Sequence, residues 1–317
     1  MKALYLVSGI GPPAGWGTEF IQELIFKLSK RGVKATIINP IYKHTHPDWA
    51  EWTKEQEKKY GIRIISLDTP TIIKKNLIFH FILTPFFVTW FVIKLLLREK
   101  FDLVHEFSSI PIILFRSLLV KLLFKTPTLF TLSVYNNTLL GKFFWFKIFD
   151  FAKFYCIPSR EIIKNLVNLG INQKKIVFCP PGINMEIFKK PINKSVARQR
   201  LNLPADKTII SFFGSLTSEK GIPDLLKAVD KINSNLKRKI IIAVFAIWKG
   251  SSTHEKWARK IRERGPTLKL FEGKVSIPDV IWASDAIVLP QRTGHGATIP
   301  PISIIETLAT GKLLITT

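Results

Sequence analysis

The sequence predicts an α/β protein with a doubly wound parallel sheet in each half of the chain. Short apolar runs without polar alternation suit strands that are buried on both faces of a sheet. These runs alternate with segments whose apolar residues recur at helical spacing. A glycine-containing turn follows the first run of each half, and 317 residues are enough for two domains of ordinary size.

The composition narrows the class of protein further. The chain is 47% hydrophobic and 22% charged, which indicates a globular protein. Its two cysteines, Cys156 and Cys179, form neither a disulfide framework nor a metal-binding spacing, so reduced intracellular thiols are expected. The first predicted strand begins almost at Met1, which leaves no room for a signal peptide.

The formal net charge of +24 predicts a polyanionic partner. Nucleic acid is not the expected partner, because the sequence has no zinc-finger spacing, RNA-binding signature or basic zipper. A steep salt dependence of binding to duplex DNA would be needed to support it. An anionic membrane surface is the better expectation, for a reason that lies in the first half of the chain.

Three apolar segments in the first half favour contact with a membrane. Residues 76–97 are the most hydrophobic, but a histidine and a proline interrupt them, which favours a buried core helix over a spanning helix. Residues 112–125 and 142–153 mix large apolar side chains with lysine and arginine, as basic amphipathic helices at membrane surfaces do. Ordinary core helices in a lysine-rich protein are the alternative.

The turn in the first half joins a strand at residues 3–8 to a helix at residues 20–31. Its glycines, Gly15 and Gly17 among them, would let the backbone approach a phosphate, and the helix start would offer free N–H groups. A tight structural turn is the alternative. A dinucleotide fingerprint is disfavoured, because two prolines lie within the loop.

The second half contains two segments that can carry chemistry. A strand at residues 208–213 leads into a turn with Gly214, Lys220 and Gly221, where a lysine could neutralise a diphosphate. Near the end of the sequence, a strand, a glycine loop and a helix bring Glu306 to the edge where ligands bind in such sheets. The alternatives are an ordinary turn and a solvated glutamate.

The stretch from Pro290 to Thr316 resembles the nucleotide-sugar signature of retaining GT-B glycosyltransferases of the glycogen-synthase-like family 4. Glu306 matches the second of that family's two glutamates, and the first falls on Thr298. The turn at Gly214 matches the family's phosphate-binding turn, with Ser215 where the family has an arginine. In the first half, Ser133 replaces a usual histidine.

The resemblance covers the whole chain and implies the GT-B fold, in which two Rossmann-like domains face each other across a cleft. Residues 1–185 would form the acceptor-side domain with the membrane-facing helices. Residues 186–207 would be a linker with one short helix, and residues 208–317 the nucleotide-sugar domain. The closing C-terminal helices of the family are expected to be truncated here.

The resemblance also implies a set of site residues. Lys220 and Glu306 would be the catalytic residues, and His105 and Ser133 would lie on the acceptor side. The donor would be bound by Gly15, Gly17, Gly214, Ser215, His295, Gly296 and Thr298. No metal and no cofactor is expected, since a UDP- or GDP-sugar serves as co-substrate.

The implied activity is metal-independent transfer of a hexosyl group, with retention, from a nucleoside-diphosphate sugar to a hydroxyl. A lipid-linked or polysaccharide precursor is the expected acceptor, and the expected location is cytoplasmic, peripheral at the inner face of the membrane. Because three family positions are altered, a catalytically silent GT-B module that binds nucleotide or lipid, or scaffolds a partner, stays open as the alternative. A sugar-nucleotide epimerase fits the Lys220 and Glu306 patterns less well.

Overall fold

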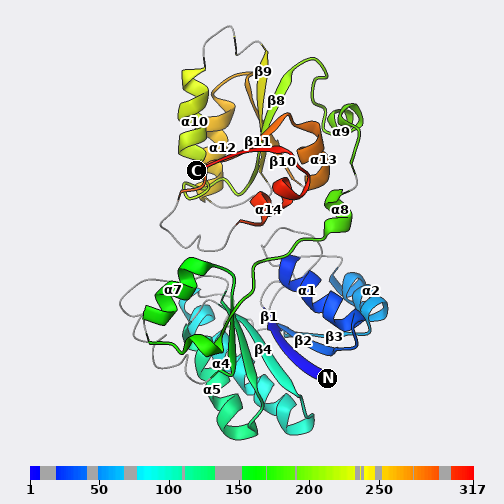
Figure 1. Cartoon of the computed structure of the whole chain (residues 1–317), viewed down its shortest axis with the longest axis vertical. Coiled ribbons are helices and arrows are strands. Elements are labelled where there is room, and N and C mark those ends of the chain that lie inside the picture. Colours follow the sequence, from blue (N-terminus) through cyan, green and yellow to red (C-terminus); the bar gives the residue numbers. More distant parts are fainter. Residues whose placement is uncertain are drawn as a thin grey trace. The chain divides into compact units, whose positions relative to one another are not determined.

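The computed structural model divides the chain into two compact units, Met1–Pro181 and Gly182–Thr317 (Figure 1). Each unit is built on its own parallel sheet. The structure describes residues 1–7, 19–40, 49–67, 77–108, 111–132, 152–168, 170–189, 191–232, 236, 239–246, 252–273, 275–292 and 301–317.

Unit 1 contains a seven-stranded parallel sheet of order β3-β2-β1-β4-β5-β6-β7. Its strands are β1 (Lys2–Val7), β2 (Lys34–Pro40), β3 (Arg63–Leu67), β4 (Leu103–Ser108), β5 (Thr128–Leu132), β6 (Phe154–Ile157) and β7 (Ile176–Phe178). Its described helices are α1 (Glu19–Lys30), α2 (Trp49–Tyr60), α4 (Leu77–Arg98), α5 (Pro111–Phe124), α7 (Arg160–Asn168) and a 3₁₀ turn at Gln173–Lys175. The strand order reverses between β1 and β4.

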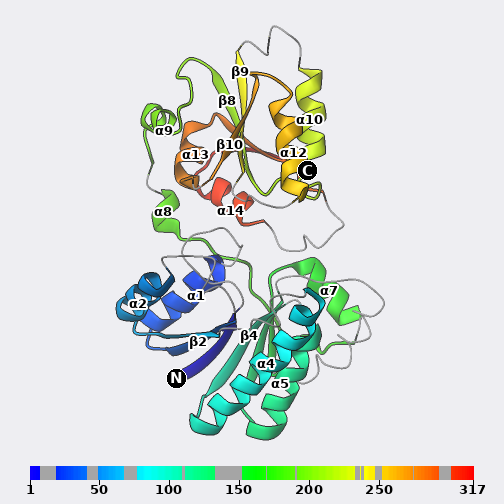
Figure 2. The ribbon, with the colours of Figure 1, turned by 180° about the vertical axis from the view of Figure 1, so that it is seen from behind.

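Strand β1 is buried on both faces, as its uninterrupted apolar run predicts. On one face, Tyr5 and its alternate neighbours pack against α1 and α2. On the other face, Leu4 and Leu6 pack against α4 and α5. Figure 2 shows α4 and α5 next to each other on that side of the sheet.

Helix α4 is a core helix, which was the preferred interpretation of residues 76–97. One face of α4, with Val88, Val92 and Leu95, is buried against the sheet. Among the helices that the structure describes, none combines the length and apolarity needed to cross a membrane. Most of the third apolar segment, residues 142–151, lies outside the described residues.

Unit 2 contains a five-stranded parallel sheet of order β10-β9-β8-β11-β12. Its strands are β8 (Thr208–Gly214), β9 (Ile240–Ala246), β10 (Leu268–Glu272), β11 (Ala286–Leu289) and β12 (Leu313–Thr316). Its described helices are α8 (Met185–Lys189), α9 (Lys194–Arg200), α10 (Ile222–Lys231), α12 (Ser252–Arg262), α13 (Ile277–Ala283) and α14 (Ile302–Ala309). The strand order reverses between β8 and β11.

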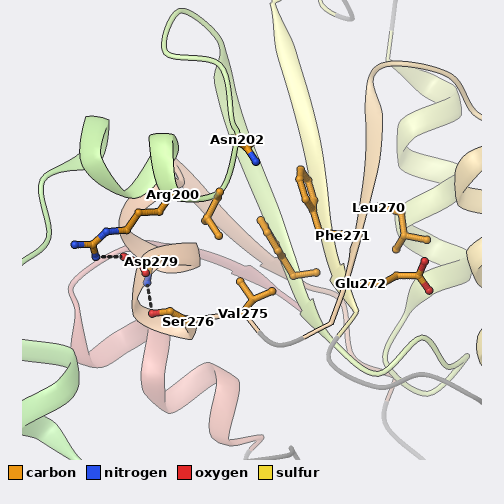
Figure 3. A pocket seen from close by; sticks show the side chains of 10 residues that line it. Arg200, Asn202, Leu270, Phe271, Glu272, Val275, Ser276 and Asp279 are labelled. Carbon is orange, nitrogen blue, oxygen red and sulfur yellow. Dashed lines mark hydrogen bonds and ion pairs between the residues drawn. The ribbon is translucent and has the colours of Figure 1, made fainter.

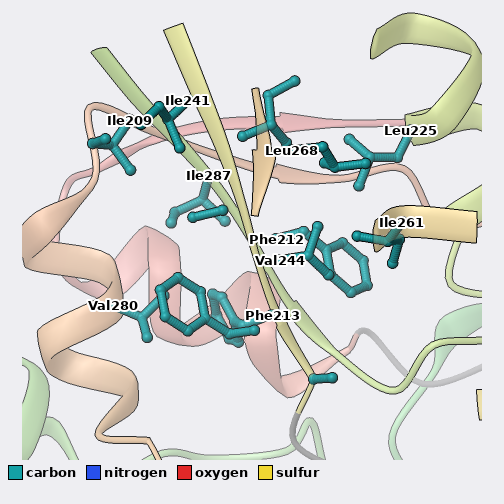
Figure 4. Close-up of a cluster of buried hydrophobic side chains, with 14 of the residues drawn as sticks. Ile209, Phe212, Phe213, Leu225, Ile241, Val244, Ile261, Leu268, Val280 and Ile287 are labelled. Atoms are coloured by element: carbon teal, nitrogen blue, oxygen red, sulfur yellow. The ribbon is translucent and has the colours of Figure 1, made fainter. Parts of the chain in front are cut away.

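The core of unit 2 has the same two-sided construction (Figure 4). Leu225 of α10 and Ile261 of α12 lie on one side of the strands, and Val280 of α13 lies on the other. Phe212 and Phe213 of β8 point to opposite faces, so this central strand supplies an aromatic ring to each layer.

Residues 186–207, which were predicted to be a linker with one short helix, fall within unit 2, and α8 and α9 lie in this part of the chain. Helix α9 packs against α13. The buried Arg198 donates from Nε to the carbonyl oxygen of Ala283 (2.9 Å) and from Nη2 to Asp285 (2.8 Å). The segment looks like a linker in sequence because α9 is polar, and these tertiary contacts hold it in place.

Candidate functional site

The candidate site of unit 2 lies where the strand order reverses, beyond the carboxyl ends of β8 and β11. In open α/β sheets, ligands bind at this kind of switch point. Ile287 of β11 pairs in register with Ser211 of β8, so the chain segments that follow these strands run beside each other. Those segments are the turn at residues 215–221 and the start of the loop at residues 290–292.

Gly221 fixes the contact between these two segments. It precedes α10 with a φ of +75°, a left-handed conformation that glycine adopts at little cost. A Cβ atom added to Gly221 would lie only 1.5 Å from the carbonyl oxygen of Pro290. The backbone of the β11 loop therefore lies directly against the N-terminus of α10, and only glycine fits there.

Lys220 lies immediately before this contact. Its Nζ is 3.5 Å from Oε1 of the buried Gln291. Burial lowers the pKa of Lys220 below its ordinary value, and the structure shows no ion pair between Lys220 and an acidic residue of the described chain. A half-buried ammonium group close to a helix N-terminus is a place where an anionic ligand would be stabilised.

A second cation, Arg292, lies on the β11 loop next to Gln291. Its backbone N–H donates to the carbonyl oxygen of Glu219 (3.0 Å). Its guanidinium group makes two bonds to Asp224 in the first turn of α10, from Nε (2.7 Å) and from Nη2 (2.8 Å). The bond from Arg292 also holds the pKa of Asp224 below its ordinary value. The sequence patterns gave Arg292 no role.

Glu306 lies on α14, the helix that follows the β11 loop. It is buried, with 9% of its surface exposed, so the alternative of a solvated helix residue is wrong. The helix contacts α8 and β12 of the same unit. Thr307, the next residue, donates from Oγ1 to the carbonyl oxygen of Ser303 (2.7 Å), as a helical hydroxyl often does.

The structure places the other predicted donor residues only in part. Gly214 ends β8 with a φ of +147°, and Ser215 follows it and accepts a bond from the N–H of Thr217 (3.1 Å). Gly214, Ser215 and Lys220 thus belong to one continuous turn. The remaining predicted site residues lie outside the described residues: Gly15, Gly17, Ser133, His295, Gly296 and Thr298.

In unit 1, His105 lies on β4 and is buried beside β1. Its Nε2 is 2.8 Å from Oγ1 of Thr131, and its ring stacks on Phe107 at 4.0 Å between centroids. Burial lowers the pKa of His105 to about 3, so the ring is neutral at ordinary pH. The geometry gives His105 a packing role, and its acceptor-side role stays a prediction.

Unit 2 also has a hollow of about 490 Å³ that no sequence pattern indicated (Figure 3). It lies beside the ends of β9 and β10, and its lining includes Phe245 and Phe271, whose ring centroids are 4.7 Å apart. At its rim, Arg200 pairs with Asp279 at 3.0 Å. Among the described residues, no group of three or more histidine, cysteine, aspartate or glutamate side chains could hold a metal ion.

Two doubly wound parallel sheets in one chain, with a glycine turn and a half-buried lysine at the switch point of the second, define the GT-B class of fold. Residues 17–187 match the family model described as Glycosyltransferase Family 4. Residues 193–317 match the model described as Glycosyl transferases group 1. The chain therefore belongs to Glycosyltransferase Family 4.

Solved structures share this fold. Sucrose-phosphate synthase from Thermosynechococcus elongatus superposes with a TM-score of 0.73 at 16% identity, over 99% of this chain and 80% of its own. A glycosyltransferase from Rickettsia africae gives 0.71 at 21% identity, over 99% and 78%. Anabaena Alr3699/HepE in complex with UDP gives 0.69 at 15% identity, over 100% and 80%.

Two curated relatives match shorter stretches. The Escherichia coli protein WcaI, described as a colanic acid biosynthesis glycosyl transferase, is 21% identical over 155 residues, which is 48% of this chain. The D-inositol 3-phosphate glycosyltransferase of Xylanimonas cellulosilytica is 28% identical over 89 residues, which is 26% of this chain. The matched stretches span only 37% and 21% of those relatives.

Proposed function

We propose that this protein transfers a hexosyl group from a nucleoside-diphosphate sugar to a hydroxyl acceptor, with retention at the anomeric carbon. One observation carries the proposal: Lys220, half-buried and without an ion-pair partner in the described chain, lies at the switch point of a sheet in a family of glycosyltransferases. UDP in the HepE structure supports UDP as one candidate donor nucleotide, and GDP is the other.

In this proposal, Lys220 offsets the negative charge that grows on the diphosphate as the glycosidic bond breaks. Glu306 accepts hydrogen bonds from the ribose hydroxyls of the donor. The reaction needs neither a metal nor a further cofactor, because the ammonium group and the N-terminal end of the α10 dipole stabilise the leaving group. The predicted roles of Gly15, Gly17, His295, Gly296 and Thr298 belong to the same proposal.

The test is calorimetric titration with UDP, GDP and their sugars, using the wild type, Lys220→Ala and Glu306→Gln. Loss of one charged hydrogen-bond partner weakens binding by about 10- to 100-fold. The matched control is Lys231→Ala, because Lys231 lies at the opposite end of α10. Turnover of the bound sugar nucleotide, even slow hydrolysis, is the second readout.

Three results would overturn the proposal. A folded wild type that binds none of these nucleotides supports the silent scaffold module instead. Nucleotide binding without any turnover, in the presence of glycolipid or polysaccharide acceptors, supports a silent nucleotide-binding module. If Lys231→Ala weakens binding as much as Lys220→Ala, the effect is general electrostatics rather than a site at the turn.

We also infer that the outer face of α4 and α5 docks on an anionic bilayer, where a lipid-linked or polysaccharide precursor would be the acceptor. Large apolar side chains are exposed on this face: Leu83, Phe86, Trp90 and Leu97 of α4 and Leu122 and Leu123 of α5. We call these six residues the apolar face. Monomeric proteins seldom expose so many large apolar side chains on two adjacent helices.

The charges around the apolar face favour an anionic membrane, rather than a second copy of the chain, as the partner that covers it. Neither α4 nor α5 contains an acidic residue, while Lys94 lies over the ring of Trp90 at 5.0 Å and Lys121 precedes Leu122. Two such basic faces would repel each other, whereas anionic headgroups complement them. The cytoplasmic leaflet carries anionic lipids, which agrees with the proposed peripheral location at the inner face of the membrane.

Sedimentation with phosphatidylcholine vesicles, with and without phosphatidylglycerol, tests the docking face. We expect binding only to the anionic vesicles, weakened by salt and lost in Trp90→Ser/Leu123→Ser. The control is Ile187→Ser, which removes a side chain that is 49% exposed on α8, outside the apolar face. A wild type that stays in the supernatant at low salt, or a double variant that still sediments, refutes the docking face.

A further inference from the structure

We propose that Arg292 is the second cation of the diphosphate site and takes over the work of the arginine that Ser215 replaces. The inference rests on the proposed function, since it concerns how a nucleoside diphosphate is held at the switch point. No sequence motif marks Arg292 as a phosphate ligand, because it lies on the β11 loop rather than in the turn after β8.

The backbone brings Arg292 to the same place as Lys220. Arg292 donates its N–H to the carbonyl oxygen of Glu219 (3.0 Å), the neighbour of Lys220. Oε1 of Gln291, the neighbour of Arg292, accepts a hydrogen bond from Nζ of Lys220 (3.5 Å). Two consecutive residues of the β11 loop thus contact two consecutive residues of the β8 turn, and each segment contributes one cation.

The turn needs side-chain cations because its amide donors are few. The N–H of Gly221 is already bonded to the carbonyl oxygen of Ser218 (3.0 Å). Pro223, in the first turn of α10, has no N–H to offer. A helix start with free amides can bind a phosphate by itself, but this one lacks part of that capacity.

Asp224 orients the guanidinium group of Arg292. The Asp224 carboxylate accepts hydrogen bonds from Nε and Nη2 of Arg292, and these two bonds fix the plane of the guanidinium group. Nη1 has no hydrogen-bond partner in the described chain. Arg292 in turn neutralises a carboxylate that would otherwise repel a diphosphate at the start of α10. Removing Arg292 therefore takes away one cation and exposes one anion at the same end of the helix.

A purely structural surface ion pair is the competing explanation, and the chain offers a matched example of one. Arg264 binds Asp230 through Nε and Nη2, both at 3.0 Å, and Asp230 lies on α10 at the end opposite to Asp224. The two pairs have the same chemistry and the same helix. Only the Arg292 pair lies at the switch point.

The experiment is calorimetric titration of the wild type, Arg292→Gln and Arg264→Gln with UDP, GDP, UMP, GMP, uridine and guanosine. For the nucleotide series that the wild type binds, we expect Arg292→Gln to weaken diphosphate binding at least about tenfold, because a charge-assisted hydrogen bond is lost. Binding of the nucleoside should not change, and Arg264→Gln should bind all ligands like the wild type. Arg292→Gln/Asp224→Asn should recover part of the loss, since it also removes the exposed anion.

The outcomes separate the two proposals. If Lys220→Ala weakens diphosphate binding and Arg292→Gln does not, the role of Arg292 is refuted while the proposed function stands. If Arg292→Gln weakens the nucleoside as much as the diphosphate, the residue is structural and the inference is wrong. If the wild type binds none of the six ligands, both proposals fail. Melting curves of each variant test whether the loss of ligand binding comes from unfolding.

Discussion

At the residue scale, Gly221 is the position where the backbone allows least change. We predict that Gly221→Ala destabilises unit 2 far more than Gly265→Ala, although both glycines have nearly the same φ, +75° and +78°. Each alanine loses about 1 kcal/mol to the left-handed conformation. Only at residue 221 does the new Cβ also meet a backbone atom, the carbonyl oxygen of Pro290.

The additional loss in Gly221→Ala should be at least about 2 kcal/mol of unfolding free energy, measured by urea denaturation. Gly265→Ala is the control, because nothing lies within 4 Å of its added Cβ. The relief of the clash must push the β11 loop away from α10, so nucleotide binding should weaken together with stability. Equal losses in the two variants would contradict the close backbone contact.

His105 gives a pH dependence whose sign follows from its burial. Its pKa is lowered to about 3 in the folded chain, against the ordinary 6.5, so the unfolded chain binds more protons between these values. Stability from the neutral, buried ring is complete above about pH 6.5 and is lost as pH falls toward 3. The maximal slope is about 1.4 kcal/mol per pH unit.

His105→Gln removes this titration while it keeps a side chain that can bond to Thr131. We predict that the unfolding free energy of unit 1 falls less steeply in His105→Gln than in the wild type as pH is lowered from 6.5 to 4.5. Urea denaturation of the whole chain, followed through the unit 1 transition, measures it. Carboxylates titrate in the same range in both proteins, so the difference between the two slopes is the informative quantity. Identical slopes would show that the ring is protonated without cost in the folded state.

At the element scale, the strands were the most predictable part of the fold. Residues 208–213 were predicted as a strand, and so was the apolar run before the glycine loop near the end of the sequence. In the structure β8 occupies Thr208–Gly214 and β11 occupies Ala286–Leu289. Both are short apolar runs that a glycine or a proline ends, so the pattern and the boundary agree. One short helix was predicted in residues 186–207, but not its packing on α13, because the buried contacts of Arg198 that hold α9 in place leave no periodic pattern in the sequence.

The site was predictable only where one continuous segment builds it. The spacing of Gly214, Lys220 and Gly221 was visible in the sequence and the structure places all three in one turn. The contacts of Gln291 and Arg292 with that turn were not visible, because they depend on the register of two strands that are distant in sequence. No local pattern encodes such a register.

The ion pair that joins α5 to β4 gives a prediction at this scale. Arg116 binds Glu106 through Nε (3.0 Å) and Nη2 (2.9 Å), and both side chains are buried. Glu106→Gln or Arg116→Met alone should cost about 3–5 kcal/mol of unfolding free energy, because each removes one charge of a buried ion pair and leaves the other without this counter-charge. Urea denaturation of unit 1 measures this cost.

The double variant Glu106→Gln/Arg116→Met should be less destabilised than the sum of the two single variants, since neither charge remains. Arg264→Gln, which breaks an exposed pair of the same geometry, should cost less than about 1 kcal/mol. Single variants that lose no more than Arg264→Gln would show that the buried pair does not anchor α5.

At the scale of the whole molecule, the two units have separate cores. The hydrophobic cluster of unit 2 draws all its buried members from residues 188–289, and the three clusters of unit 1 draw theirs from residues 3–171. Each cluster in the described chain lies within one unit, and a unit with its own hydrophobic core can unfold cooperatively by itself. We therefore predict two calorimetric transitions rather than one.

Variants and ligands assign the two transitions. Glu106→Gln should lower the midpoint temperature of the unit 1 transition only. Gly221→Ala should lower the midpoint temperature of the unit 2 transition only. UDP or GDP should raise the midpoint temperature of the unit 2 transition, because Lys220 and Arg292 belong to unit 2. At a ligand concentration of a hundred times Kd, the unfolding free energy of unit 2 rises by about 2.7 kcal/mol. A single transition that all three perturbations shift alike would mean that the units unfold as one body. If a nucleotide raises only the midpoint temperature of unit 1, the donor site does not lie at the switch point of unit 2.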